Sequence, residues 1–204
     1  TLSKNSSAWY LTHDTQNCLL SSFDAVLMRK DPPFDLEYFY ATHLLERAQL
    51  QGARVFNSGA ALRNHPEKLA ILEFPQFTAP TLVTRDMEVL KRFYEQYGDV
   101  VYKPLDGMGG TGVFRAGPAE RNLNVILETL TAMGTQSIMA QQFLPEISQG
   151  DKRILIIDGV PVPYCLARIP KTGETRGNLA AGGVGVAQPL SSSDRQVAEA
   201  LGPL

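Results

Sequence analysis

Residues 98–115, with the sequence GDVVYKPLDGMGGTGVFR, carry the strongest structural signal in this chain. An apolar run leads to Lys103, a loop rich in glycine follows, and a second apolar run starts at Val113. Gly107, Gly109 and Gly112 have the spacing G-x-G-x-x-G, but the dinucleotide-binding fingerprint requires a helix directly after its glycines. Strand-forming residues follow here instead, and no G-x-x-x-x-G-K-[ST] is present. The segment therefore predicts neither a Rossmann site nor a P-loop.

What this segment does predict is a strand, a glycine loop and a second strand, with a lysine directly ahead of the loop. Glycine allows backbone N–H groups to approach phosphate oxygens closely, and lysine adds a compact positive charge. Lys103 alternates with Val101 in an otherwise apolar run, and a charged residue at such a position indicates a functional role. We therefore expect a flap that binds nucleotide phosphates. A glycine-rich hairpin without a ligand is the alternative.

Composition limits the classes of protein to which the chain can belong. It has 204 residues, 44% hydrophobic and 20% charged, as in a soluble protein with one large or two small domains. The net charge of −2 attracts neither nucleic acid nor a membrane surface, and no apolar run approaches the ~20 residues of a membrane span. Cys18 and Cys165 are far apart, which favours two buried thiols in the cytoplasm over a disulfide. We expect a cytoplasmic protein with no nucleic-acid or membrane partner.

Strand and helix patterns alternate along the chain, which predicts an α/β fold. Strands are expected over 23–28, 54–57, 81–84, 100–102, 113–114, 137–143, 153–157 and 161–169. Helices are expected over 36–51, 66–74, 86–97, 123–133 and 191–201. Asp158 and Gly159 form a dipeptide typical of a hairpin turn. Residues 170–189 contain five glycines and no periodicity, which predicts either a disordered segment or a functional lid.

Positive charges at the ends of expected elements are candidate binding residues, because loops beside regular elements often carry function. They are Arg29, Lys30, Lys68, Lys103, Lys152, Arg153, Arg168 and Arg176. A single surface cation is usually only solvated, so most weight falls on Lys103 and on the triplet 151–153, which opens an apolar strand.

Six segments together resemble the prokaryotic-type glutathione synthetase family, a group of ATP-grasp ligases. They are MRKDPPFD (28–35), PEKL (66–69), VYKPLDGMGGTGVFR (101–115), MAQQFLP (139–145), GDKRILIIDG (150–159) and PVPYCLARIPKTGETRGNLAAGG (161–183). KPLDGMGG and ARIP…GETRGNLAAGG are together specific to this family. A lysine followed by a glycine loop indicates only ATP-grasp proteins in general.

The resemblance implies an ATP-grasp fold of α+β character with a glycine-rich β-loop-β flap. Residues 1–65 would be the remnant of an N-terminal βα domain, 66–144 the small or lid subdomain, and 145–204 the start of the C-terminal subdomain. The family's first βα portion and its last segment, which holds the metal-binding Asp, Glu and Asn, have no counterpart here. We therefore expect a piece of a longer protein that has no metal ligands of its own and is inactive alone.

The activity implied by the resemblance is ligation of γ-glutamylcysteine to glycine through an acyl phosphate, giving glutathione, ADP and phosphate. It implies ATP, γ-glutamylcysteine and glycine as small-molecule partners, Mg²⁺ or Mn²⁺ as cofactor, and a homo-oligomer when the protein is full length. Two alternatives stay open. One is another ATP-grasp ligase that joins a carboxylate to an amine, and the other is a non-catalytic nucleotide-binding module.

The resemblance also assigns roles to individual residues. The expected ATP-binding residues are Lys68, Lys103, Gly107, Met108, Gly109, Gly110, Gly112, Gln141, Gln142, Phe143, Leu144 and Asp151. Within that set the two lysines would contact phosphates, residues 141–144 would hold the adenine by backbone groups at a strand edge, and Asp151 would bind the ribose hydroxyls. The expected catalytic residues are Arg153 and Arg168, which would face the phosphates and the acyl phosphate, and Arg176, which would move in with its long glycine loop to cover the site. Arg29 is the candidate for a substrate carboxylate.

Overall fold

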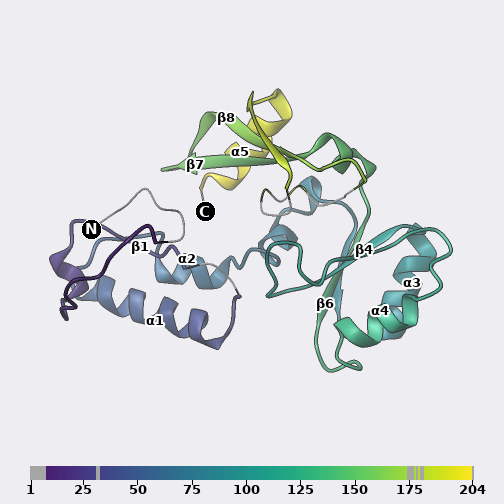
Figure 1. Cartoon of the computed structure of the whole chain (residues 1–204), viewed down its shortest axis with the longest axis horizontal. Coiled ribbons are helices and arrows are strands. Elements are labelled where there is room, and N and C mark those ends of the chain that lie inside the picture. Colours follow the sequence, from purple (N-terminus) through teal and green to yellow (C-terminus); the bar gives the residue numbers. More distant parts are fainter. Residues whose placement is uncertain (1–7, 31–32, 174–176, 178, 180–181, 204) are drawn as a thin grey trace.

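The computed structural model describes residues 8–30, 33–173, 177, 179 and 182–203. Figure 1 shows three parts, which follow one another along the chain. The first contains β1, β2, α1 and α2, the second contains a four-stranded sheet with α3 and α4, and the third contains a three-stranded sheet with α5. This arrangement of strands and helices confirms the predicted α/β class.

The first part is small and mostly helical. Strands β1 (Val26–Leu27) and β2 (Val55–Phe56) pair in parallel, after a short 3-10 turn η1 (Leu20–Ser22). Helix α1 (Leu36–Leu50) begins at Asp35, whose carboxylate accepts a hydrogen bond from the Tyr38 amide at 2.8 Å. Helix α2 (Gly59–Asn64) begins at Ser58 in the same way. A Cβ on Gly59 would lie 2.1 Å from the carbonyl oxygen of Thr42 in α1, so the close contact of the two helices requires glycine there.

The second part is an antiparallel sheet with two helices on one face. Its strand order is β3 (Thr81–Thr84), β6 (Ile138–Gln142), β4 (Val100–Pro104) and β5 (Phe114–Ala116). Helix α3 (Met87–Tyr97) begins at Asp86 and ends at Gly98, which has a φ of 70°. Helix α4 (Leu123–Leu130) packs beside it.

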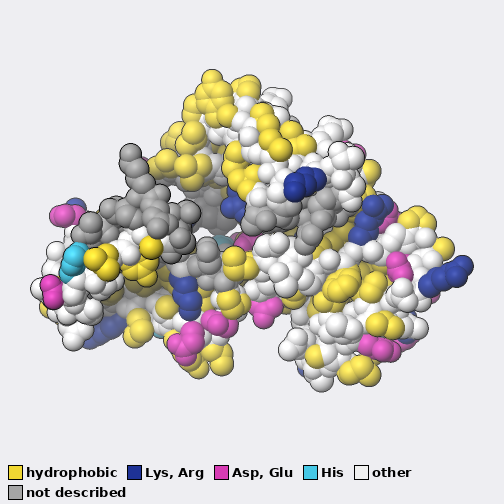
Figure 2. Space-filling model, viewed as in Figure 1, with side chains coloured by type: hydrophobic (Ala, Val, Ile, Leu, Met, Phe, Trp, Pro, Cys, Tyr) yellow, Lys and Arg dark blue, Asp and Glu magenta, His cyan; other side chains and the backbone are white. Residues whose placement is uncertain are grey.

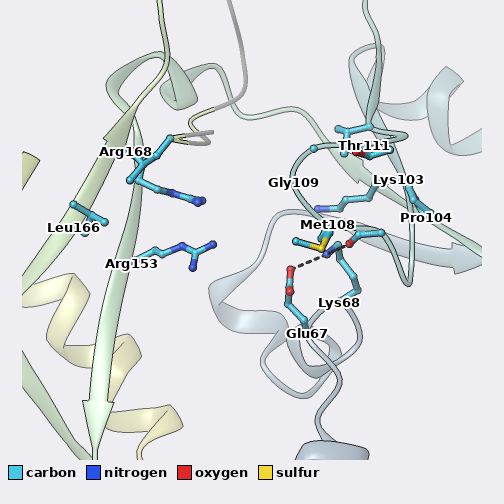
Figure 3. A pocket seen from close by; sticks show the side chains of 14 residues that line it. Glu67, Lys68, Lys103, Pro104, Met108, Gly109, Thr111, Arg153, Leu166 and Arg168 are labelled. Carbon is cyan, nitrogen blue, oxygen red and sulfur yellow. Dashed lines mark hydrogen bonds and ion pairs between the residues drawn. The ribbon is translucent and has the colours of Figure 1, made fainter. Parts of the chain in front are cut away.

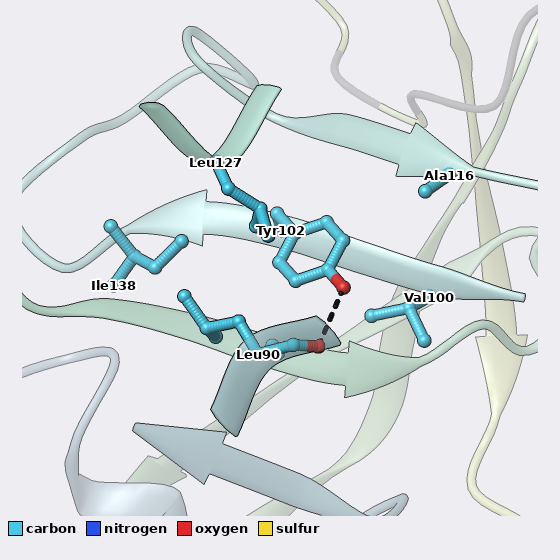
Figure 4. Close-up of a cluster of buried hydrophobic side chains, with 7 residues drawn as sticks. Leu90, Val100, Tyr102, Ala116, Leu127 and Ile138 are labelled. Atoms are coloured by element: carbon cyan, nitrogen blue, oxygen red, sulfur yellow. Dashed lines mark hydrogen bonds between the residues drawn. The ribbon is translucent and has the colours of Figure 1, made fainter. Parts of the chain in front are cut away.

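The core of the second part is the helix-covered face of its sheet (Figure 4). It consists of Leu90, Val100, Tyr102, Ala116, Leu127, Ile138 and Ala140. The Tyr102 hydroxyl donates a hydrogen bond to the Leu90 carbonyl at 3.2 Å, which satisfies the one polar group of this ring in the core. Because side chains alternate along a strand, Val101 and Lys103 project from the opposite face. That face is turned toward the third part of the chain, and it carries the candidate site.

The third part is an antiparallel sheet in the order β7 (Asp151–Ile157), β8 (Val160–Ile169) and β9 (Val184–Pro189). A 3-10 turn η4 (Pro145–Gln149) precedes it. The predicted hairpin turn at Asp158 and Gly159 is confirmed, and both residues have positive φ. Helix α5 (Ser192–Leu201) covers one face of the sheet. Figure 2 shows hydrophobic side chains gathered on the surface of this part.

The structure corrects several sequence-based expectations. No α-helix spans 66–74. The described chain has instead the 3-10 turns η2 (Ala70–Glu73) and η3 (Pro75–Phe77), the second of which begins at Pro75. Strand β9 lies within 170–189, where neither a strand nor any periodicity was expected, and pairing with β8 stabilises it. Cys18 is exposed, so only Cys165 is a buried thiol.

Candidate active site

A cavity of about 500 Å³ lies between the glycine loop of the second part and the β7–β8 sheet of the third. Lys68 and Lys103 line it from the side of the loop. Arg153 and Arg168 line it from β7 and β8, and Figure 3 shows these arginines pointing toward the lysines across the cavity. Four cations from distant parts of the sequence therefore face one space, which suits a ligand with several negative charges.

The glycine loop that joins β4 to β5 is built from tight turns. The Thr111 amide donates to the Met108 carbonyl at 3.0 Å, and Gly109, Gly110 and Gly112 all have positive φ. Gly107 has a different reason to be glycine, because a Cβ there would lie 2.8 Å from the side chain of Pro104. The backbone of the loop therefore lies close against β4, beside the two lysines.

Lys68 joins the loop to the segment ahead of the second part. Its Nζ donates to the Gly107 carbonyl oxygen at 3.1 Å and to Glu67 Oε1 at 2.7 Å. Its side chain is only 17% exposed. This ammonium group therefore has a fixed position at the base of the flap, which the sequence did not indicate beyond the motif PEKL.

Lys103 projects from β4 into the same space. Its Nζ donates a hydrogen bond to Oε1 of Gln141 on the neighbouring strand β6. Burial lowers the pKa of Lys103 below that of an ordinary lysine, and the positive charge of Lys68 lowers it further, while Glu67 acts in the opposite sense. Two lysines held near one another on one wall favour the binding of an anion between or above them.

A second cavity, of about 700 Å³, adjoins the first and shares Glu67, Lys68, Lys103 and Val113 with it. Nine of its sixteen lining residues are apolar: Ile71, Phe77, Ala79, Val101, Val113, Met139, Phe143, Leu144 and Ile147. An apolar space with a few polar groups, next to a cluster of cations, suits a flat base that is joined to phosphates.

The expected adenine-binding residues line this second cavity, but their backbone is not at a free edge. Strand β6 lies between β3 and β4, and Gln141 pairs with Thr81 on one side and Val101 on the other. The Gln142 amide donates to the Pro80 carbonyl at 3.0 Å, and the Phe143 amide donates to the Asp99 carbonyl at 2.9 Å. Contact with a base through backbone donors of residues 141–143 is therefore limited by the sheet, because these donors already have partners.

Asp151 and Arg168 contact each other directly. They face each other across β7 and β8, and two hydrogen bonds join the guanidinium to the carboxylate, from Nε to Oδ1 at 2.6 Å and from Nη2 to Oδ2 at 2.5 Å. Asp151 raises the pKa of Arg168 through these hydrogen bonds. Arg168 lines the first cavity and Asp151 does not. A ribose contact by Asp151 stays a prediction.

Arg29 lies at a third cavity of about 490 Å³, which shares Glu67, Lys68, Gly107 and Arg153 with the first. Lys30 and His65 also line this third cavity. Arg29 is therefore close to the other candidate residues in space, although the sequence separates it from them widely. Arg176, the remaining candidate, lies outside the described residues.

Two neighbours of the site lie within the quoted motifs, but the sequence assigned neither of them a role. Glu67 lines all three cavities and binds Lys68. Arg115 lines the second cavity, pairs with Asp99 and lies over the ring of Phe143. Single exposed charges are common in any sequence, so only the fold distinguishes these two.

Within the described ranges, no group of three or more His, Cys, Asp and Glu side chains could hold a metal ion. The donor sets among these residues therefore do not fit a divalent cation. A search of the same residues for a helix long and apolar enough to cross a membrane finds none.

Models of known families match most of the chain. The model for the prokaryotic glutathione synthetase ATP-grasp domain matches residues 67–204, and the model for the N-terminal domain of the same family matches residues 1–63. The chain belongs to the prokaryotic glutathione synthetase family. The expected ATP-grasp fold is thereby confirmed.

Bacterial glutathione synthetases are also similar to this chain in sequence. The protein of Bordetella parapertussis is 67% identical over 193 residues, which are 95% of this chain and 61% of that relative. The protein of Nitrosomonas europaea is 60% identical over 196 residues, which are 96% of this chain and 61% of that relative. The chain thus spans about three fifths of the length of these glutathione synthetases.

Among solved structures, the crystal structure of a D-cycloserine synthetase has a similar fold. It superimposes with a TM-score of 0.65 at 20% identity and covers 89% of this chain and 64% of that one. At this identity the likeness concerns the fold and not the substrate.

Proposed function

We propose that the protein that carries this chain is a glutathione synthetase, which joins γ-glutamylcysteine to glycine and converts ATP to ADP and phosphate. The observation that carries the proposal is the cavity between the glycine loop and the β7–β8 sheet, into which two lysines and two arginines point. Membership of the glutathione synthetase family supports the choice of substrates.

The charges of the reaction explain these residue types. A carboxylate must attack the γ-phosphate of ATP, and both groups are anions, so their repulsion has to be neutralised before they can meet. In this proposal Lys68 and Lys103 bind the phosphates of ATP beneath the glycine loop. Arg153 and Arg168 approach from the opposite wall and stabilise the acyl phosphate as it forms. The amine of glycine then attacks the acyl carbon, and phosphate leaves.

The adenine belongs in the second cavity under the same proposal. That cavity is lined mainly by apolar residues and shares both lysines with the first cavity, so a base there would place its phosphates at the first cavity. Residues 141–144 would form the wall beside the base. The carboxylate of Asp151 can accept ribose hydroxyls while it stays bonded to Arg168, because two carboxylate oxygens offer about four acceptor sites.

The third cavity supports a place for γ-glutamylcysteine. It contains Arg29, Lys30 and His65 and shares Arg153 with the first cavity. A dipeptide with two carboxylates could bind one of them at Arg29 and present the other near Arg153. The glycine loop, closed over the phosphates, would exclude water, which otherwise hydrolyses an acyl phosphate.

The family implies a divalent cation, and we propose Mg²⁺ with Mn²⁺ as a substitute. Such an ion would neutralise phosphate charge when bound. The described residues offer no ligand set for it, so the residue roles given above do not depend on it.

The test is product formation by the purified protein, expressed from its own gene, with ATP, Mg²⁺, γ-glutamylcysteine and glycine. Mass spectrometry should find glutathione, and omission of any one substrate should abolish it. Rapid ligation of other carboxylate–amine pairs, without glutathione formation, would instead favour another ATP-grasp ligase. Tight ATP binding without turnover of any pair would favour a non-catalytic nucleotide-binding module.

A further inference from the structure

A row of polar side chains crosses three strands on the open face of the four-stranded sheet. Thr81 belongs to β3, Gln141 to β6 and Lys103 to β4. Gln141 is the direct cross-strand partner of both Thr81 and Val101, and Lys103 lies two residues beyond Val101 on the same face. The three side chains therefore lie side by side, although Thr81 and Gln141 are 60 residues apart in sequence.

Hydrogen bonds connect this row from end to end. Lys103 Nζ donates to Gln141 Oε1, Gln141 Nε2 donates to Thr81 Oγ1 at 2.8 Å, and Thr81 Oγ1 donates to the carbonyl oxygen of Ala79 at 2.7 Å. All of these contacts are partly buried. The row thus ends on a backbone carbonyl, which can only accept.

The chemistry of these groups allows only one direction of hydrogen bonding. A threonine hydroxyl has a single proton, and here that proton goes to the Ala79 carbonyl, so the hydroxyl can only accept from Gln141. The amide must therefore turn its NH₂ group toward Thr81 and its oxygen toward Lys103. An ammonium group has donors and no acceptor, so the oxygen is the one end of the amide that Lys103 can bind.

We propose that Thr81 and Gln141 are positioning residues for Lys103, and that together they aim its ammonium group at the nucleotide phosphates. Gln141 occupies one of the three N–H donors of Lys103 and leaves two for phosphate oxygens. Thr81 acts through Gln141, since it lines neither of the two cavities that share Lys103. This inference rests on the proposed function, because it takes ATP as the ligand.

Removal of the Thr81 hydroxyl should allow the side-chain amide of Gln141 to flip. In Thr81→Val the NH₂ group loses its acceptor, so Thr81 no longer excludes the amide orientation that presents a donor to the ammonium of Lys103. We expect the affinity for ADP to fall about five- to tenfold, the size of effect that one lost hydrogen bond produces. Adenosine, which has no phosphate, should bind as tightly as it does to the unchanged protein.

Isothermal titration calorimetry with ADP and with adenosine on the protein expressed from its own gene provides the measurement. Thr81→Ser keeps the hydroxyl and should restore ADP affinity. Thr135→Val is the matched control, because the Thr135 hydroxyl also donates to a backbone carbonyl but lies away from the three cavities of the site. Gln141→Met should weaken ADP binding on its own, and Thr81→Val added to Gln141→Met should cause no further loss.

Each outcome decides the matter. An unchanged protein that binds neither ADP nor ATP would overturn the proposed function itself. If it binds ADP and Thr81→Val binds equally well, or weakens adenosine and ADP alike, the positioning role is wrong. If Thr81→Val does not fold, Gln141→Met takes its place, and full ADP affinity in that variant overturns the inference.

Discussion

The guanidinium carbon of Arg115 lies 3.6 Å from the centroid of the Phe143 ring. The same guanidinium forms two hydrogen bonds with the Asp99 carboxylate, at 2.9 and 2.7 Å, and the Phe143 amide donates to the Asp99 carbonyl at 2.9 Å. Arg115 thus joins the outer strand β5 to the end of β6, at the wall of the cavity that suits a base. The guanidinium occupies one face of the ring, so only the other face of Phe143 is available to a base in this cavity.

We therefore predict that Arg115→Met weakens the binding of adenosine about three- to tenfold, since the contact with the ring and the pair with Asp99 are both lost. Calorimetry with adenosine measures this loss. Arg121→Met changes an exposed arginine without these contacts and serves as the control. Equal adenosine affinity in the two variants would contradict a role for Arg115 in the shape of this cavity.

Removal of the Lys103 ammonium should slow the reaction strongly. The group is largely enclosed and faces the cavity where phosphates are proposed to bind, so it acts on a charge that water does not screen. Lys103→Ala should lower turnover about 100-fold or more in a steady-state assay of ADP release. Lys91→Ala removes a lysine that is bonded to Glu88 on α3 and should leave turnover unchanged. Turnover like that of the unchanged protein in Lys103→Ala would exclude Lys103 from the mechanism.

The pH dependence of nucleotide binding should carry the signature of Lys103. Because burial lowers its pKa, the ammonium loses its proton at a lower pH than an ordinary lysine does, and ADP affinity should fall as the pH rises through that range. Lys103→Arg should remove this step, since arginine stays charged. The stability of the ligand-free protein should change with pH in the opposite direction. The unfolded chain binds more protons between the lowered pKa and 10.5, so the contribution of Lys103 to the free energy of unfolding rises with pH there.

Gly107→Ala should disturb the flap. The added Cβ would lie 2.8 Å from the side chain of Pro104, so the loop must shift away from β4, and the Gly107 carbonyl would move relative to Lys68. We expect ADP affinity to fall about tenfold or more, because small displacements in a phosphate site are costly. Gly117→Ala is the matched control, since nothing lies within 4 Å of a Cβ there. A Gly107→Ala protein that binds ADP normally would show that the loop adapts freely.

Local signals in the sequence predicted much of the fold. Asp35 and Asp86 start expected helices because each carries an acceptor for the first free amides, and Gly98 ends one because it adopts a positive φ, whereas the helix after Ser58 was not expected. The hairpin at 158–159 and the strand–loop–strand around the glycines follow from equally short-range chemistry. These features depend on a few neighbouring residues, and the sequence shows them directly.

Contacts between distant residues were not predictable in the same way. The order β3-β6-β4-β5 and the presence of β9 depend on pairing between strands far apart in sequence. For the same reason the mutual bonding of Asp151 and Arg168 was missed, although both were candidates. Sequence motifs predicted which residues belong to the site. The register of the strands determines which residues pair with its charged side chains, and the sequence did not show that register.

The acyl phosphate is the central chemical claim, and an isotope experiment tests it directly. γ-Glutamylcysteine labelled with ¹⁸O in both oxygens of its cysteinyl carboxylate is incubated with ATP, Mg²⁺, glycine and the protein expressed from its own gene. If the carboxylate attacks the γ-phosphate and the amine of glycine then displaces phosphate, one ¹⁸O atom passes into inorganic phosphate and one remains in the new amide. We predict one labelled oxygen for each phosphate released. Glutathione formed with unlabelled phosphate, or no glycine-dependent release of phosphate at all, would contradict the account.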